Sequence, residues 1–501
     1  MILTDKQKNI YAWLGALVIT AVFLVAAAQT LTTAPRFWFD EGVNLQAARN
    51  VAEQGYFNLQ TAPGVPYDKP YQLLTTGYPV SGLLGLIFTL TGFSFAVARG
   101  YMLVWMALLL FGTFWFAKKM FGVLPALFSV LLLATFAPIV FHGKSIIGEI
   151  PGLALFLLGL AALDGAEAYR GRTALRTVVA GLLLGLAVAT KPIYLLLFIA
   201  IAFVLFLKRR HYAGGFADWK QRILFWVALA VPLALFVLTI LPPDVSFSHL
   251  AGIAESYQGR ASQGHFFANI FENAKRFFSE DALLYTLVLS GIAAFAVPWR
   301  RMWRGEWRTV HSVLVVAAVL MLLFFLQSVG WNRYLVFYQG LLLAVFPAAL
   351  AKILKYSSRL HEVDTRMFKG SLAALLLSAL VLFQGYYLFF RSDFFSGSLG
   401  TDVEAFFAER APTGRIYAVS ALKNAAMIPS SQLHQFFRFE DRRVMPNRLA
   451  NLAEERFDYL FLDSADPDAV LFMDTINALY ESAGVIGDKT LFALRRGKIL
   501  P

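Results

Sequence analysis

Long apolar segments recur through most of this chain, and they constrain its fold more than any other feature. A helix needs about 20 mostly apolar residues to cross the hydrocarbon core of a bilayer. Of the 501 residues, 58% are hydrophobic and 15% are charged, a balance that suits a chain surrounded largely by lipid. The predicted spans are 10–30, 96–117, 121–141, 150–167, 177–191, 193–207, 222–241, 281–298, 311–329, 334–352 and 370–390. We therefore expect an all-α polytopic membrane domain of about eleven transmembrane helices.

The basic residues between these segments predict the orientation. With a cytoplasmic N-terminus, the short basic connections all fall on the cytoplasmic side, as the positive-inside rule requires. These connections are residues 118–119, 170–176, 208–222, 300–308 and 352–369. The net charge of +12 is thus spread over several loops and forms no single basic tract. It indicates membrane topology, and we expect no nucleic-acid partner.

Two regions depart from the spanning pattern. The apolar stretch 79–92 is too short to span, so we place it along the membrane surface in a long external loop, residues 31–95. Residues 393–501 contain many charges and the strand-like runs 415–419, 459–463 and 490–494. We expect a transmembrane domain at 1–392 and a small extracytoplasmic α/β domain at 393–501. The pair Gly181 and Gly185 predicts a surface for close helix packing.

Acidic residues occur at two places on the predicted external surface. Asp40 and Glu41 follow an aromatic run just after the first span, and Glu149 lies in the second external loop. A carboxylate that is partly removed from water can act as a general base toward a hydroxyl. The alternative for Asp40 is a structural role, as the N-cap of a helix that begins at Gly42. Glu149 could equally be a charge that favours a helix start.

Cationic and aromatic residues accompany these carboxylates on the same face. Tyr67 and Lys69 lie in the first external loop, Lys191 lies in a tight turn between two spans, and Arg333 with Tyr334 lies in a short external turn. Lysine binds phosphate as a point charge, and arginine can bind it with two parallel hydrogen bonds. A snorkelling surface lysine and an interfacial Arg–Tyr anchor are the alternatives. A lysine buried at the position of Lys191 needs an anionic partner.

Taken together, these residues are a set suited to sugar transfer from a phosphate leaving group. A base would activate the acceptor hydroxyl, and cations would stabilise the charge that grows on the departing phosphate. The chain has no cysteine, which excludes disulfides and thiolate chemistry. A transporter or lipid flippase is the rival class, although such proteins usually place ionisable groups near the bilayer midplane.

In this order and on this face, the residues resemble the integral-membrane glycosyltransferases of the C-type fold. The branch concerned contains the protein O-mannosyltransferases and the lipid A aminoarabinose transferase. The resemblance rests on Asp40-Glu41, Lys69-Pro70, Glu149, Thr190-Lys191-Pro192 and Arg333-Tyr334. It covers roughly residues 10–350.

The resemblance implies a bacterial inner-membrane enzyme that moves one sugar from a polyprenyl phosphate to a lipid, glycan or protein hydroxyl, with inversion. Asp40 would be the base, Lys69 and Tyr67 would contact the donor phosphate, and Arg260 would be a further phosphate ligand. Glu149 would shape the acceptor region, and a divalent metal ion at Asp40 and Glu149 is left open.

The sugar is also open. Val43 replaces an arginine of the aminoarabinose transferases, and Pro70-Tyr71 replaces their Pro-Pro pair. An oligosaccharide ligase is the alternative among enzymes.

Overall fold

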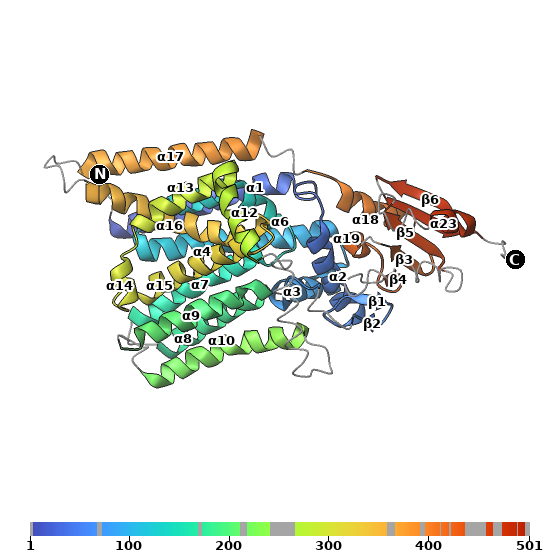
Figure 1. The fold of residues 1–501 in the computed structure, drawn as a ribbon, viewed down its shortest axis with the longest axis horizontal. Coiled ribbons are helices and arrows are strands. Elements are labelled where there is room, and N and C mark those ends of the chain that lie inside the picture. The colour runs from blue at the N-terminus through green and yellow to red at the C-terminus, as the bar shows by residue number, and fades with distance from the viewer. Residues whose placement is uncertain are drawn as a thin grey trace.

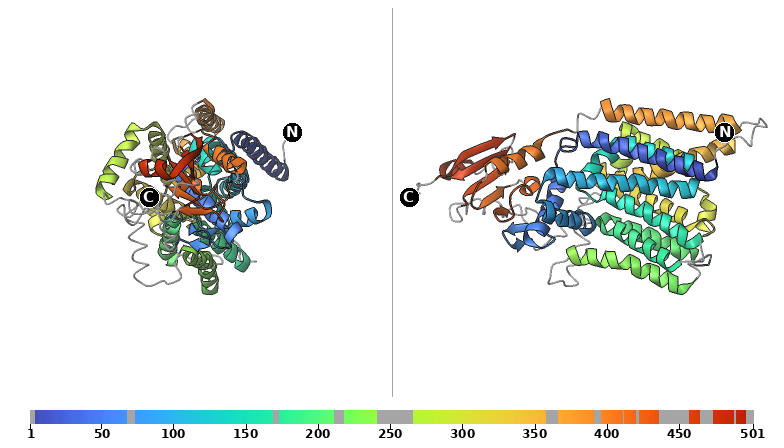
Figure 2. Two further views of the ribbon diagram at one scale, coloured as in Figure 1. Left: turned by 90° about the vertical axis from the view of Figure 1, so that its right-hand side faces the viewer. Right: turned by 180° about the vertical axis from the view of Figure 1, so that it is seen from behind.

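The computed structural model describes residues 4–67, 73–168, 173–210, 218–240, 266–357, 366–390, 396–410, 412–419, 422–435, 457–463, 473–487 and 489–495. A bundle of roughly parallel and antiparallel helices forms one part, and a small domain of strands and helices lies at one end of it (Figure 1). The view from behind shows the same arrangement (Figure 2). The predicted boundary at 392/393 falls outside the described residues.

Within these ranges, seven helices are long and apolar enough to cross a membrane. They are α1 (Asp5–Gln29), α4 (Phe95–Phe121), α7 (Glu149–Ala168), α10 (Trp219–Ile240), α15 (Thr309–Gln327), α16 (Arg333–Ser357) and α17 (Arg366–Phe390). Two bent pairs raise the number of spans in the described part to as many as nine. These pairs are α5 (Val123–Thr135) with α6 (Ala137–Lys144), bent by 64°, and α12 (Phe266–Ser279) with α13 (Asp281–Phe295), bent by 91°. The chain is a multi-pass membrane protein.

The remaining predicted spans correspond to shorter helices. The segment 177–191 falls on α8 (Thr173–Ala189), and 193–207 falls on η2 (Pro192–Tyr194) with α9 (Leu195–Leu207), followed by η3 (Lys208–Arg210). At 1.5 Å per residue, the 17 residues of α8 rise about 25 Å, which is less than the hydrocarbon thickness of about 30 Å. The predicted span 121–141 is also not one straight helix, because it bends at Phe136 between α5 and α6.

Helix α7 forms the centre of the bundle, with 94% of its apolar window buried. It packs closely against α4 and α8. Glycines allow the close approach of α8 to α10: a Cβ at Gly185 would overlap the Leu229 carbonyl oxygen, and one at Gly181 would lie 2.6 Å from the Phe225 carbonyl oxygen. The predicted packing surface at these two glycines is therefore confirmed.

One end of the bundle carries α14 (Trp299–Trp303), which overlaps the basic segment 300–308, and is called the α14 end below (Figure 1). There, Asp164 of α7 accepts from Arg308 at 2.8 Å and from Lys119 at 3.3 Å. The opposite end carries α2 (Phe39–Gln54), α3 (Tyr78–Thr91), and strands β1 (Gln60–Ala62) and β2 (Val65–Pro66); it is called the α2 end. The surface stretch predicted at 79–92 is thus the short helix α3.

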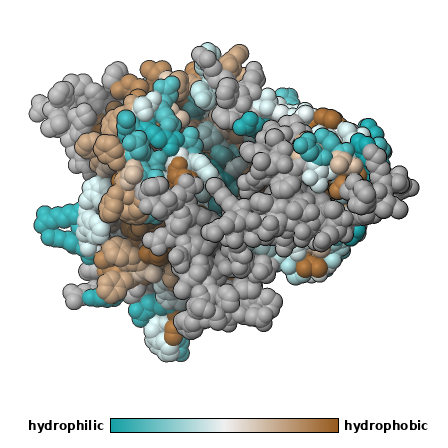
Figure 3. Space-filling model, turned by 45° about the vertical axis from the view of Figure 1, so that its right-hand side comes forward, coloured by the Kyte–Doolittle hydropathy of each residue, from teal (hydrophilic) through white to brown (hydrophobic). Residues whose placement is uncertain are grey.

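The C-terminal part is a mixed α/β domain, as predicted. Its five-stranded sheet has the order β4-β3-β5-β7-β6, with β3, β4 and β5 parallel and β7 antiparallel to both of its neighbours. On the face drawn in Figure 3, hydrophobic side chains cover much of the described bundle, and hydrophilic ones are more frequent on this domain. The elements are α18 (Leu399–Arg410), β3 (Ile416–Val419), α19 (Leu422–Ala425), β4 (Leu433–Gln435), β5 (Tyr459–Asp463), α23 (Met473–Leu479), β6 (Tyr480–Ile486) and β7 (Lys489–Leu494).

Buried and partly buried hydrogen bonds connect this domain to α2 and β1. Arg49 donates to the Ala426 carbonyl at 2.9 Å, and the Glu53 carboxylate accepts from the Ser430 backbone N–H at 2.8 Å. Gln60 of β1 donates to the Ser430 carbonyl at 2.7 Å. The second half of α2 is therefore held against the C-terminal domain.

A substitution at Gly42 can test this contact between α2 and the C-terminal domain, because α19 lies directly against Gly42. A Cβ at Gly42 would overlap the backbone of Lys423, whereas a Cβ at Gly100 would meet nothing within 4 Å. We expect Gly42→Ala to destabilise the protein by about 1–3 kcal/mol through overpacking. Gly100→Ala, the control in a helix of the same bundle, should leave the midpoint of thermal unfolding unchanged or raised. Equal midpoints for the two variants would contradict the close contact.

Candidate functional site

The first turn of α2 carries the two predicted acidic residues. The helix begins at Phe39, and its N-cap is Trp38, which has an extended backbone and makes no side-chain capping bond. The alternative in which Asp40 caps a helix starting at Gly42 is therefore wrong. Asp40 lies inside the first turn, where its carboxylate is available for a contact elsewhere.

Asp40 pairs with Arg333, the first residue of α16. Both side chains are buried, and Arg333 Nη1 donates to Asp40 Oδ2. The guanidinium also lies over the rings of Trp38 and Trp331, at 4.8 and 4.2 Å from their centroids. This aromatic enclosure holds the charged group in place and excludes water from one side of it.

A second buried pair joins the next two predicted residues. Lys191 Nζ donates to Glu149 Oε1, between the turn that precedes η2 and the first residue of α7. The sequence required an anionic partner for a buried Lys191, and Glu149 is that partner. The two segments approach closely because Gly148 lies against the Thr190 carbonyl, with no room for a side chain.

The two pairs act on each other electrostatically. Burial raises the pKa of the Asp40 carboxyl above its ordinary value, and the charges of Arg333 and Lys191 oppose that rise, while Glu149 adds to it. Asp40, Arg333, Glu149 and Lys191 are therefore one group, which is called the charge cluster below. It has two carboxylates and two cations, and it joins four segments that are far apart in the sequence.

Two atoms of the charge cluster can still form hydrogen bonds. Glu149 Oε2 and Arg333 Nε are buried and have no hydrogen-bond partner in the described part of the protein. A buried polar atom without a partner is costly, so such atoms often indicate a place where a ligand or water binds. One of these atoms accepts and the other donates, which suits a ligand with a hydroxyl and an anionic oxygen.

Glu41 lies beside Asp40 in sequence but has a different partner. Arg99 of α4 donates to both of its carboxylate oxygens, at 2.9 and 2.8 Å, and neither side chain has any exposure. Arg99 also donates to the Leu31 carbonyl at 3.0 Å. This ion pair joins α2 to α4 and to the end of the first span. Arg99 was not among the predicted site residues.

The aromatic residues predicted for phosphate binding occupy different surroundings. Tyr334 follows Arg333, whose guanidinium lies 5.1 Å from its ring centroid. Tyr67 is buried against Val43 and Ala47 of α2, and its backbone N–H donates to the Leu59 carbonyl at 2.8 Å. Lys69 and Arg260 lie outside the described residues, so their roles stay predictions.

A cavity of about 420 Å³ adjoins the charge cluster at the α2 end. Its walls include Trp38 and His142, which also contact each other with ring centroids 6.3 Å apart, and they continue along α6, α13 and α17. Most of the lining is apolar, with Tyr285 and Gln384 hydrogen-bonded to each other at 2.7 Å. Such a lining fits a hydrophobic ligand whose polar end reaches toward Trp38.

The sequence left open a divalent metal ion at Asp40 and Glu149, and the surroundings of these two carboxylates bear on it. No group of three or more His, Cys, Asp or Glu residues within the described ranges is arranged to hold a metal ion. Arg333 and Lys191 already pair with the two carboxylates, and their positive charges would repel a divalent cation. The two carboxylates, paired in this way, do not fit a divalent metal ion.

Comparison with solved structures confirms the predicted C-type glycosyltransferase fold. The chain matches the structure of ArnT from Cupriavidus metallidurans bound to undecaprenyl phosphate with a TM-score of 0.62 and 15% identity, covering 96% of this chain and 98% of that chain.

The Archaeoglobus fulgidus oligosaccharyltransferase in complex with Zn and sulfate matches with a TM-score of 0.54 and 15% identity, covering 95% of this chain and 73% of that chain. The same enzyme tethered with an acceptor peptide gives a TM-score of 0.51 and 12% identity, covering 96% and 74%. No protein-family model and no curated protein matches the chain.

Proposed function

We propose that this protein is a glycosyltransferase that moves a single sugar from a polyprenyl-phosphate donor to a hydroxyl acceptor, with Asp40 as the base. The observation that carries the proposal is the charge cluster. It brings together a buried carboxylate with a raised pKa and two cations, beside a cavity suited to a hydrophobic chain. The shared fold adds support, since ArnT has been obtained bound to undecaprenyl phosphate.

In this proposal, the acceptor hydroxyl binds next to Asp40. The carboxylate removes the proton as the hydroxyl oxygen attacks the anomeric carbon of the donor sugar. A new glycosidic bond forms, the bond between the anomeric carbon and the phosphate oxygen breaks, and the configuration inverts. A base is most effective when its pKa approaches the working pH, and burial moves the pKa of Asp40 in that direction.

The departing phosphate needs positive charge around it. Arg333 supplies a guanidinium whose Nε has no hydrogen-bond partner among the described residues, and Lys191 supplies an ammonium held by Glu149. Both are buried, where electrostatic stabilisation of a growing charge is stronger than in water. Glu149 is then a positioning residue for Lys191. Lys69 and Arg260 would add further phosphate contacts, and Tyr67 and Tyr334 would lie at the edge of the site.

The cavity beside Trp38 would receive the first isoprene units of the donor. We place the α2 end and the C-terminal domain outside a bacterial inner membrane and the basic α14 end in the cytoplasm, because positive charge favours the cytoplasmic side. The sugar, whether hexose or pentose, and the lipid or glycan acceptor are not specified by these residues.

Arg333→Lys tests the phosphate role. The lysine keeps the charge but lacks the planar fork and the Nε donor, so donor affinity should fall about tenfold or more. Binding of undecaprenyl phosphate to the purified protein, followed by quenching of tryptophan fluorescence, measures this directly. Arg410→Lys, on α18 away from the cluster, is the control and should bind like wild type. Unchanged affinity in Arg333→Lys would remove this residue from the phosphate site.

The reaction class needs a separate assay. Proteoliposomes containing the protein, a radiolabelled monosaccharide polyprenyl phosphate and membrane-lipid acceptors should form a labelled glycolipid and release polyprenyl phosphate. Movement of the intact donor across the bilayer without product would support a flippase instead. Transfer only from an oligosaccharide-loaded donor would support a ligase.

A further inference from the structure

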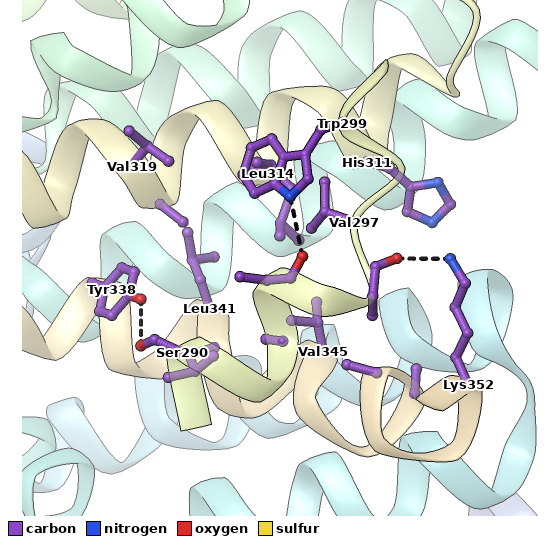
Figure 4. Close-up of a pocket in the computed structure, with 18 of the residues that line it drawn as sticks. Ser290, Val297, Trp299, His311, Leu314, Val319, Tyr338, Leu341, Val345 and Lys352 are labelled. Atoms are coloured by element: carbon purple, nitrogen blue, oxygen red, sulfur yellow. Dashed lines mark hydrogen bonds between the residues drawn. The ribbon is translucent and has the colours of Figure 1, made fainter. Parts of the chain in front are cut away.

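A second cavity, of about 500 Å³, lies at the other end of the bundle from the proposed active site. Helices α13, α15 and α16 form its walls, with the end of α4 beside them (Figure 4). Its volume is within the range of small-molecule sites, roughly 300–1,000 Å³. None of the residues of the charge cluster lines it.

The cavity is long and apolar. Along α16 it extends from Tyr338 to Lys352, a rise of about 21 Å at 1.5 Å per residue. Leu314, Leu341 and Val345 line the part between (Figure 4). On its outer side, Gly291 and Val319 are exposed, so the cavity opens toward the surrounding lipid. One leaflet is about 20–22 Å thick when its headgroup region is included, so the cavity together with its polar mouth has the length of one lipid in one leaflet.

Its two ends differ in polarity. At the deep end, Tyr338 and Ser290 satisfy each other with a hydrogen bond of 2.5 Å. At the other end, Lys352 donates to the Ala296 carbonyl at 2.7 Å, and His311 lies near it with its Nδ1 buried and lacking a hydrogen-bond partner in the described structure (Figure 4). The charged group of Lys352 and the unsatisfied His311 Nδ1 are therefore both at the mouth.

The mouth also has the features of a membrane interface. Trp299 and Trp307 line it, and the short helix α14 adds the exposed side chains of Arg300 and Arg301. Tryptophan is enriched where the hydrocarbon meets the headgroups, and basic side chains there attract anionic lipids. The charge at the mouth complements a phosphate group, and the apolar interior complements a hydrocarbon chain.

We propose that this cavity is a binding site for an anionic phospholipid, with one acyl chain between α13, α15 and α16 and the phosphate at Lys352 and the arginines of α14. The site is separate from the proposed donor site, because it lies at the α14 end and extends for only half the bilayer. It therefore holds a lipid of the leaflet opposite to the charge cluster.

Filling the cavity tests the acyl-chain part of this proposal. A Cβ at Gly291 meets nothing within 4 Å, so Gly291→Phe can enter the cavity without moving the backbone. Gly385→Phe is the matched control, since this α17 glycine also has open space around it and does not line the cavity. Native mass spectrometry of the detergent-purified protein, titrated with dioleoyl phosphatidylglycerol, should show about tenfold weaker lipid retention for Gly291→Phe. The control should retain lipid like wild type.

A second variant tests the headgroup part. Lys352→Gln should weaken phosphatidylglycerol retention about fivefold, and it should leave the much weaker retention of dioleoyl phosphatidylcholine unchanged. Equal retention of the two lipids by wild type would overturn the anionic preference. Unchanged phosphatidylglycerol retention in Gly291→Phe, or displacement of the bound lipid by undecaprenyl phosphate, would overturn the site itself. Neither result depends on the proposed transferase activity.

Discussion

Asp40→Asn is expected to lower the turnover of sugar transfer by about a thousandfold, the middle of the range for loss of a general base. The amide has the shape of the carboxylate and can still accept from Arg333, so the local structure should remain. It cannot take the proton from the acceptor hydroxyl. Product formation from a saturating polyprenyl-phosphate sugar measures the effect, and donor binding should change much less than turnover.

The pH dependence of this variant gives a second readout. In the wild-type protein, Asp40 must be deprotonated to act, so turnover should fall as the pH is lowered through its pKa. Burial raises that pKa above the ordinary aspartate value of roughly 3.9, which moves the acidic limb of the profile toward neutral pH. In Asp40→Asn this limb should be absent from the residual activity.

Asp402→Asn is the control for the same chemical change. Asp402 lies in α18 of the C-terminal domain, where it accepts from Ser398 at 2.7 Å. Its replacement should leave turnover and the pH profile intact. If Asp40→Asn turns over like wild type, or keeps the acidic limb, another group is the base.

The pattern of apolar segments was enough to predict the membrane bundle, because the length and period of an apolar stretch directly reflect the bilayer. It could not predict the bends at Phe136 and before Asp281. Hydropathy does not report such a break, and at the first bend the sequence signal is Pro138, which lies at the start of α6 and cannot continue the helical hydrogen bonding of α5. The apolar pattern likewise did not show that α8 is short, because apolar residues continue as far as the turn at Lys191.

Pairing within the site was predictable only in part. The sequence indicated that a buried Lys191 needs an anion, but several external carboxylates were equally suitable until the fold brought Glu149 to it. The Asp40–Arg333 contact joins residues 293 positions apart, and no local pattern specifies it. Asp40 as a capping residue failed because the helix starts earlier, at Phe39.

Arg99 was missed although its signal was present. It is an isolated arginine within a predicted span, and an ionisable residue at membrane depth usually has a partner. That rule, applied to Arg99, would have led to the two adjacent carboxylates at 40 and 41. The sequence could then suggest that each carboxylate has its own cation, as the structure has it.

Glu41→Gln should have the largest effect on stability. Arg99 would keep its full charge in a site without exposure, and breaking a buried ion pair typically costs about 3–5 kcal/mol. The midpoint of thermal unfolding in detergent, followed by circular dichroism, should fall strongly. Arg99→Met should have a similar effect for the opposite reason, because it leaves the carboxylate of Glu41 unpaired.

The double variant Glu41→Gln with Arg99→Met separates structure from catalysis. Both charges are then absent, so much of the lost stability should return, since apolar replacement of a buried pair is often tolerated. If Glu41 serves to position α2 against α4, turnover should recover together with stability. If stability returns and turnover does not, Glu41 takes part in the chemistry itself. Where turnover recovers, adding Asp40→Asn should remove it again, because Asp40 pairs with Arg333 and not with Arg99.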